Sequence, residues 1–104
     1  MSAAVTFVTC KDRKQASSIA RALVKEKLAA CVNVVPGIAS IYRWNGKVEE
    51  AREVLLVIKS RRALSRKLSD RVRALHSYDV PEVVTIPIAG GNPAYLRWVR
   101  QSTR

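Results

Sequence analysis

The chain has 104 residues, with 19 lysines and arginines against 8 aspartates and glutamates, and its formal net charge is +11. This length allows one domain with a real core, and an apolar fraction of 48% excludes global disorder. No apolar run approaches the roughly 20 residues of a membrane span, and the first residues lack the pattern of a signal peptide. We therefore expect a single cytoplasmic domain over residues 1–104 with reduced cysteines.

The residue inventory also limits the chemistry. One histidine excludes a two-histidine metal motif within one chain, and two cysteines with one histidine cannot complete a four-ligand zinc site without a carboxylate or another subunit. The sequence has no Walker loop, no Cys-x-x-Cys and no G-x-G-x-x-G. The standard kinase, zinc-finger and dehydrogenase classes are therefore excluded.

The first third of the chain predicts a strand, a helix and a second strand. Residues 4–9 are rich in β-branched side chains, which is typical of a strand. Asp12, followed three residues later by a glutamine, resembles a capping box, and apolar residues at helical spacing extend the predicted helix to about Leu28. Residues 30–35 predict the second strand, which Pro36-Gly37 interrupts as a bulge would.

The middle of the chain predicts a long hairpin. The second strand resumes at residues 40–44 and is followed by Asn45-Gly46, a strong hairpin signal because both residues tolerate positive φ. The return strand starts at Lys47 and ends in a continuous apolar run, residues 54–58, which is typical of a central strand covered on both faces or at an interface. A compact domain of this size cannot bury both arms, so we expect the tip to project.

The last part predicts a helix over residues 63–75, a strand over 83–88 and a short terminal helix. Gly90-Gly91-Asn92-Pro93 reads as a stop, an N-cap and an N1 proline, and it could also cradle an anion. This order predicts an α+β fold, a ferredoxin-like βαββαβ sandwich with a long hairpin and a short C-terminal helix. The other sheet face would then carry apolar residues with no helix over it, which predicts a partner subunit.

A basic stretch follows the predicted central strand. Between Lys59 and Arg73, seven basic residues accompany one acid, Asp70. Such a field attracts nucleic acid, acidic lipid or anionic metabolites, although most charged stretches only cover a solvated helix face. RNA recognition by base stacking is disfavoured, because the central strands offer only Phe7 as an aromatic platform. The residues predicted to contact a phosphate or nucleic acid are Arg61, Arg62, Arg66 and Lys67.

His76 and the two cysteines are the candidate metal ligands. His76 falls at the end of the second predicted helix, where a lone histidine is more often a capping group, but imidazole and thiolate also suit copper or zinc. Cys10 lies near a helix N-terminus, which would stabilise its thiolate, whereas Cys31 lies in an apolar strand and should be buried. A catalytic Cys/His/Asp set through Asp79 has no local signature.

Several motifs in register resemble the CutA family of divalent-cation tolerance proteins. The matching segments are residues 28–37 (LAACVNVVPG), 40–49 (SIYRWNGKVE), 53–59 (EVLLVIK), 78–82 (YDVPE) and 95–99 (YLRWV). The resemblance implies a ferredoxin-like, non-enzymatic homotrimer similar to the nitrogen-regulatory PII proteins. It also implies long hairpins that pair across subunits and cover exposed sheet edges.

The resemblance further implies a role in metal tolerance. Some members bind copper, so Cu(II) or another divalent metal is the expected, non-obligatory ligand in or near intersubunit clefts. The resemblance carries over His76 as a ligand, and Cys10 is the second ligand that we predict, from its thiol chemistry. The cleft positions carried over from the family are Tyr42, Trp44, Glu49, Lys59, Tyr78 and Glu82. The alternative is a signalling or binding module for a small anion, a nucleic acid or a protein partner.

Three positions depart from the family pattern. The family commonly has a proline where this chain has Ser77, and the missing ring frees the backbone beside His76. Some bacterial members place a copper-binding cysteine and a second histidine where this chain has Val8 and Leu75. Cys10 points to the same face as Val8 only if the first strand continues that far.

Overall fold

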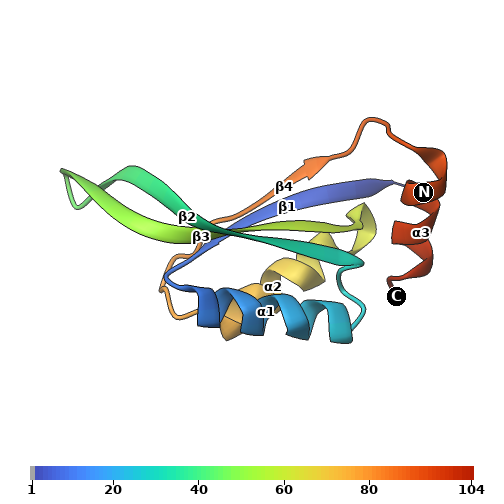
Figure 1. Ribbon diagram of the computed structural model, residues 1–104, viewed down its shortest axis with the longest axis horizontal. Coiled ribbons are helices and arrows are strands. Elements are labelled where there is room, and N and C mark those ends of the chain that lie inside the picture. Colours follow the sequence, from blue (N-terminus) through green and yellow to red (C-terminus); the bar gives the residue numbers. More distant parts are fainter. Residues whose placement is uncertain (1) are drawn as a thin grey trace.

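The computed structural model describes residues 2–104 and contains the predicted elements in the predicted order. The strands are β1 (Ala3–Cys10), β2 (Cys31–Trp44), β3 (Lys47–Arg61) and β4 (Val83–Pro87). The helices are α1 (Arg13–Lys25), α2 (Ser65–Leu75), α3 (Pro93–Gln101) and a short 3-10 turn, η1 (Arg62–Leu64). The strands pair antiparallel in the order β2-β3-β1-β4, and α1 and α2 lie on one side of the sheet (Figure 1). The predicted α+β ferredoxin-like fold is confirmed.

The side of the sheet that faces α1 and α2, here called the covered face, holds the main core. Leu56 and Ile58 of β3 are fully buried there, beside Val8 of β1. Burying an aliphatic side chain of this size stabilises the fold by about 1.5–3 kcal/mol. The buried helix residues that close this core are Ala16, Ile19, Ala20, Leu23, Leu68 and Val72.

The opposite side, here called the open face, carries apolar side chains without a helix over most of them. Val84 and Ile86 of β4 are each 48% exposed. Phe7 lies opposite both Val57 of β3 and Val84 of β4, so an apolar row crosses three strands. The terminal helix α3 covers only one end, where Val99 is buried. An uncovered apolar sheet face is thus present, as the sequence predicts, while its partner subunit stays a prediction.

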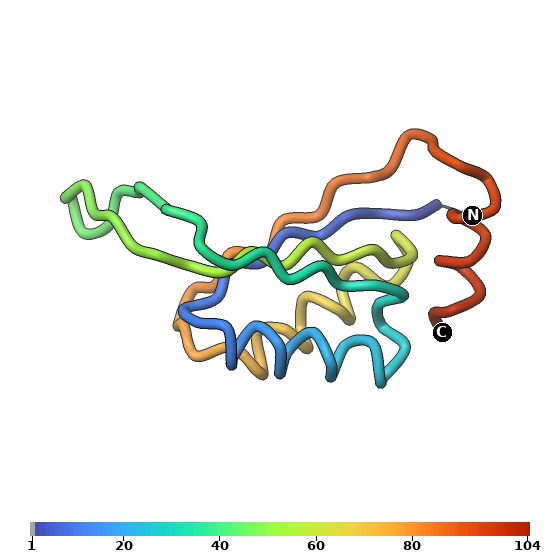
Figure 2. The backbone as a smooth tube through the Cα atoms, in the orientation of Figure 1, coloured from blue at the N-terminus to red at the C-terminus, as the bar shows by residue number. Residues whose placement is uncertain are grey.

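The β2–β3 hairpin extends beyond the body of the molecule (Figure 2), and residues 41–50 are all exposed. Asn45 and Gly46 have φ values of 50° and 77°, as a two-residue hairpin turn requires. The pairing of β2 with β3 shifts between Val35 and Ile38, at the predicted bulge. The projecting tip gives the molecule a long axis of 44 Å against 25 and 23 Å.

The helices differ from expectation at two boundaries, and one of these is the start of α2, which begins at Ser65 after the 3-10 turn and not at residue 63. The first helix ends at Lys25 and not near Leu28, because Lys27 adopts a left-handed φ of 60° and turns the chain. The Asp12 N-cap is confirmed, since Asp12 Oδ1 accepts the Gln15 backbone N–H at 2.9 Å, but the return bond of a capping box is not formed, because Gln15 Oε1 has no partner among the described residues. The last helix likewise starts with an asparagine N-cap and an N1 proline. Among the described residues, no helix is long and apolar enough to cross a membrane.

Candidate functional site

Four polar side chains gather where β1 ends, the hairpin leaves the body and the loop after α2 begins. We call His76, Tyr78, Glu53 and Cys10 the junction cluster. His76 is the C-cap of α2, and Glu53 and Cys10 come from β3 and β1, where Cys10 is paired with Val54 in the register. The cluster therefore joins three elements that are far apart in the sequence.

His76 is buried, with 9% of its surface exposed, and both of its ring nitrogens are engaged. Nε2 lies 2.7 Å from the carbonyl oxygen of Thr9, and Nδ1 accepts the backbone N–H of Tyr78 at 3.1 Å. Because a carbonyl oxygen only accepts and an amide N–H only donates, this pattern assigns the ring proton to Nε2. Nδ1 therefore presents a lone pair, and the ring is held in one orientation.

Tyr78 ties the histidine to a buried carboxylate. Its hydroxyl donates to Glu53 Oε2 at 2.8 Å, and Glu53 is only 9% exposed. Its ring lies against His76, with centroids 4.6 Å apart. Burial raises the pKa of the Tyr78 hydroxyl above its ordinary value, and the hydrogen bond to Glu53 and the nearby Tyr42 raise it further. Tyr42 of β2 also acts on the Tyr78 hydroxyl, although its backbone pairs with Glu49 on the projecting part of the hairpin, while Glu53 pairs with Ile38 nearer the body.

Cys10 is a fully buried thiol at the end of β1. The strand does continue this far, so Cys10 and Val8 share the covered face. Burial raises the pKa of Cys10 to about 11, and the carboxylates of Glu53 and Asp12 add to this shift. The predicted thiolate at a helix N-terminus is therefore wrong, because desolvation outweighs the helix dipole. Cys31 is also not fully buried, since it belongs to the open face.

The remaining predicted cleft positions lie apart from the cluster in a single chain. Trp44 and Glu49 are exposed on the hairpin tip. Lys59 lies on the open face, where its Nζ donates to Asn33 Oδ1. Glu82 is exposed in the loop before β4. Of the predicted site residues, the structure thus brings together His76, Tyr78, Cys10 and Tyr42.

Glu53 is the junction residue that the sequence analysis missed. It directly precedes the apolar run of residues 54–58, and a carboxylate beside a buried run generally requires a partner. Among residues 2–104, no group of three or more His, Cys, Asp or Glu side chains is placed to hold a metal ion. A complete metal site would therefore draw further ligands from solvent or another chain.

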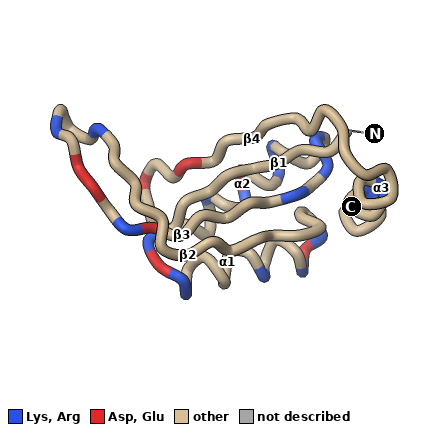
Figure 3. The backbone as a smooth tube through the Cα atoms, turned by 45° about the horizontal axis from the view of Figure 1, so that its top comes forward, with Lys and Arg blue, Asp and Glu red and all other residues tan. Residues whose placement is uncertain are grey.

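The four predicted phosphate contacts divide into two pairs. Arg66 and Lys67 are exposed on the first turn of α2. Figure 3 shows Lys and Arg positions in blue along the helices. Arg61 and Arg62 lie earlier, at the end of β3 and in η1. Arg61 is half-buried, and its Nη1 donates to the carbonyl oxygen of Arg104 at 3.3 Å. The basic residues therefore do not form one uniform surface.

The β2-β3-β1-β4 sheet, its two covering helices and the projecting hairpin define a class of small ferredoxin-like α+β proteins. Within this class, the family described as CutA1 divalent ion tolerance protein matches residues 4–102. The chain belongs to this CutA1 family. Members of the family are not known enzymes.

Relatives and solved structures agree with this assignment. The divalent-cation tolerance protein CutA of Thermus thermophilus is 52% identical over 99 residues, which cover 95% of this chain and 96% of that protein. The human protein CutA is 52% identical over 102 residues, 98% of this chain and 57% of that protein. The chloroplastic protein CutA of Arabidopsis thaliana is 51% identical over 100 residues, 96% of this chain and 55% of that protein. The chain thus spans a little over half the length of these plant and human relatives.

The fold comparison covers nearly the whole chain. The structure of the Thermus thermophilus divalent cation tolerance protein superposes with a TM-score of 0.96 at 51% identity, covering 98% of this chain and 99% of that one. The crystal structure of CutA1 from Oryza sativa superposes with a TM-score of 0.97 at 48% identity, covering 100% of this chain and 95% of that one. The hairpin and the terminal helix are therefore features shared with CutA structures.

Proposed function

We propose that this chain acts in divalent-cation tolerance as a homotrimer that binds copper or another divalent metal in or near its intersubunit clefts. Membership of the CutA1 family supports the tolerance role, which the Thermus relative carries in its name. The observation that carries the metal proposal is the buried, oriented imidazole of His76, whose ring lies against Tyr78, the residue that donates to the Glu53 carboxylate.

The hydrogen bonds of His76 indicate which of its nitrogens would bind the metal. Metal-ligating histidines usually donate their other ring N–H to a carbonyl or carboxylate oxygen, which fixes the ring. The Nε2–H to Thr9 carbonyl bond has this form, so Nδ1 is the ligand atom. Binding would exchange the Tyr78 N–H at Nδ1 for the metal, which requires a small shift of the loop around residue 78. Ser77, in place of the proline common in the family, leaves this loop freer to shift.

Cys10 and Glu53 are the other donor side chains of the junction cluster, and because the three are not already placed as one metal-holding group, either would have to shift to join His76 on a metal. A thiol ligates as the thiolate, so metal binding through Cys10 releases a proton and strengthens as the pH rises. Because the pKa of the Cys10 thiol is raised to about 11, metal binding through this thiol should depend strongly on pH in the neutral range. Glu53 keeps one oxygen bonded to the Tyr78 hydroxyl, which leaves the other oxygen free to bind a metal.

The trimer proposal is supported by the surfaces that one chain leaves uncovered. Apolar groups on the open face and a long exposed hairpin both favour cover by further copies. On the hairpin, Ile41 is 70% exposed and Val48 is 66% exposed. The tip points away from its own junction cluster, so Trp44 and Glu49 can border such a cluster only in a neighbouring chain.

Native mass spectrometry with and without a small excess of Cu(II) tests both parts of the proposal. We expect a trimer that gains three copper ions, and a loss of copper affinity of about tenfold or more in His76→Ala. His76→Asn, which retains a donor toward Thr9, should lose copper but keep the fold. Cys10→Ser should weaken binding at pH 8, while the matched variant Cys31→Ser should not.

Two sets of results would contradict the proposal, one for the metal and one for the trimer. A trimer that stays free of copper, or a His76→Ala variant with unchanged affinity, contradicts the metal proposal and leaves the trimer intact. A protein that remains a single chain at micromolar concentration contradicts the trimer and with it the intersubunit clefts.

A further inference from the structure

A second concave site lies at the end of the sheet where β1 begins and β3 ends. Ser2, Arg61, Arg62 and Ala63 line a hollow of about 420 Å³. Its backbone is held from both sides: Ala3 is the register partner of Arg61, and the Arg62 amide donates to the Ser2 carbonyl oxygen at 2.9 Å. No residue of the junction cluster takes part in this lining.

The guanidinium of Arg61 is incompletely satisfied. Nη1 donates to the Arg104 carbonyl oxygen, but Nε is buried and has no hydrogen-bond partner among the described residues. Buried donors are nearly always paired, so an orphaned N–H of a charged group favours an acceptor that binds there. Arg62 is exposed, and no carboxylate stands among the residues that line the hollow. The hollow therefore offers the exposed guanidinium of Arg62 and the part of the Arg61 guanidinium that Arg104 does not engage, with no carboxylate side chain among its lining residues.

We propose that this hollow binds the phosphate group of a small phosphorylated molecule, with Arg61 and Arg62 as its anchors. Guanidinium groups bind phosphate oxygens through paired, charge-assisted hydrogen bonds, and a second arginine matches the double charge. The volume lies within the range of small-molecule sites and exceeds what phosphate alone would fill. The net charge of +11 draws anions toward the surface in general, and the hollow places two arginines of this surface side by side.

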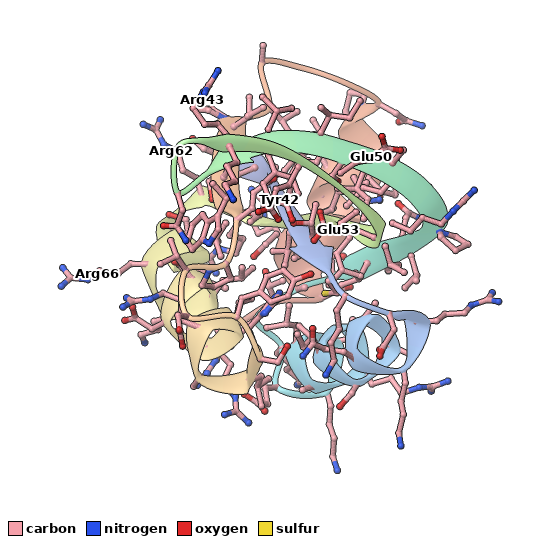
Figure 4. The ribbon with its side chains drawn as sticks, turned by 90° about the vertical axis from the view of Figure 1, so that its left-hand side faces the viewer. Tyr42, Arg43, Glu50, Glu53, Arg62 and Arg66 are labelled. Atoms are coloured by element: carbon pink, nitrogen blue, oxygen red, sulfur yellow. The ribbon has the colours of Figure 1, made fainter. Side chains whose placement is uncertain are left out.

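The same observations disfavour a nucleic-acid backbone as the occupant. Such a backbone binds along a run of exposed cations, and here Arg66 and Lys67 would serve as well as Arg62. Those two residues lie outside the hollow, and among residues 2–104 the unpaired buried N–H belongs to Arg61. Arg62 and Arg66 extend from the same side of the molecule in Figure 4, which makes them a matched pair for an experiment.

Titration calorimetry with inorganic phosphate, at an ionic strength held constant with sodium chloride, tests the site. We expect one phosphate per chain, a loss of affinity of about fivefold or more in Arg62→Gln, and a change within about twofold in Arg66→Gln. Both variants remove one exposed charge, so only the position differs. Arg61→Lys keeps the charge but loses the fork and should also weaken binding, with thermal unfolding to verify that the variant is folded.

Further measurements distinguish a phosphate site from diffuse charge or a nucleic-acid surface, and the hollow from the junction cluster. Binding without saturation, or equal losses in Arg62→Gln and Arg66→Gln, overturns the proposal in favour of diffuse charge. Binding of a short DNA duplex by a protein that does not bind inorganic phosphate overturns it in favour of a nucleic-acid surface. His76→Ala should leave phosphate binding unchanged, because the hollow and the junction cluster share no residue; loss of binding in that variant would also count against the proposal.

Discussion

The two faces of the sheet are built from alternate residues of the same strands, yet only one is complete within the chain. On the covered face Leu56 is fully buried, whereas on the open face Leu55 and Val57 remain partly exposed. The two thiols differ in the same way, with Cys10 in the core and Cys31 half-buried on the open face. Similar side chains thus have different energetic roles, which depend on the layer that covers them.

The contrast also explains the apolar run at residues 54–58. A strand with one solvated face alternates apolar and polar residues, and a strand covered on both faces does not. Here the helices cover one face, and α3 covers only one end of the other. The sequence of β3 therefore specifies a second covering layer that a single chain does not supply, in agreement with the proposed trimer.

Ile86→Asp should have the largest effect of these variants, and it should act on assembly, because it places a carboxylate on the open face of every copy. We expect the assembly to fall from three chains to one at micromolar concentration, since an unpaired carboxylate in an interface costs several kcal/mol. Size-exclusion chromatography with light scattering measures the change. Val24→Asp is the control, because Val24 is similarly exposed, at 43% against 48%, but lies on α1. An unchanged mass for both variants would show that the open face is not the interface.

Leu56→Ala and its neighbour Leu55→Ala compare the faces by stability. Leu56→Ala should lower the free energy of unfolding by about 2–5 kcal/mol, because it leaves a cavity in a fully buried core. Its effect should not change with protein concentration. The loss in Leu55→Ala should grow with protein concentration, since further copies bury this side chain only on assembly. Urea unfolding at two protein concentrations measures both, and a concentration-independent loss in Leu55→Ala would oppose assembly through this face.

The two cysteines should respond differently to alkaline pH. The pKa of Cys10 rises from an ordinary 9.0 to about 11 on folding, so the folded state retains a proton that the unfolded state loses. The stability contributed by the protonated thiol is present below pH 9 and is lost as the pH rises through 11. By pH 10.5 the loss in the free energy of unfolding amounts to about 2 kcal/mol.

Unfolding at pH 8 and pH 10.5 measures that loss. Cys10→Ala should reduce the pH dependence by this amount, whereas Cys31→Ala should leave it unchanged. If the free energy of unfolding changes equally between pH 8 and pH 10.5 in the wild type and in Cys10→Ala, burial does not raise the pKa of this thiol in the folded protein.

Much of the fold could be predicted because its signals are local. The Asn45-Gly46 turn, the Asp12 cap and the asparagine-proline start of α3 each depend on a few neighbouring residues. The end of α1 was predicted too late, because the left-handed residue there is Lys27 and not the glycine that usually marks such a stop.

The candidate site could be predicted only in part, because it depends on register and burial. His76 was found as a lone imidazole at the end of a predicted helix and Tyr78 through the resemblance, but Glu53 joins them only through its hydrogen bond with Tyr78, which the fold brings to β3. Cys10 is close to a helix N-terminus along the chain, and packing places its thiol in the core instead. The orphaned Nε of Arg61 has no sequence signal at all, since it arises from contacts between distant segments.

Tyr78→Phe should have the smallest effect, a loss of about 1 kcal/mol in the free energy of unfolding. It tests whether the hydroxyl of Tyr78 ties the junction cluster to Glu53. The substitution keeps the ring against His76 and removes only the hydroxyl that donates to Glu53 Oε2. A buried carboxylate that loses one donor is destabilised by about this amount when water can partly replace the bond. Tyr95→Phe is the matched control, because Tyr95 is 41% exposed on α3, and its loss should stay within about 0.5 kcal/mol. Thermal unfolding compares the two variants, and equal losses would mean that Glu53 is solvated in the folded chain. In that case the cluster would be an open surface, and its carboxylate would be available to a metal without any shift of the loop that follows α2.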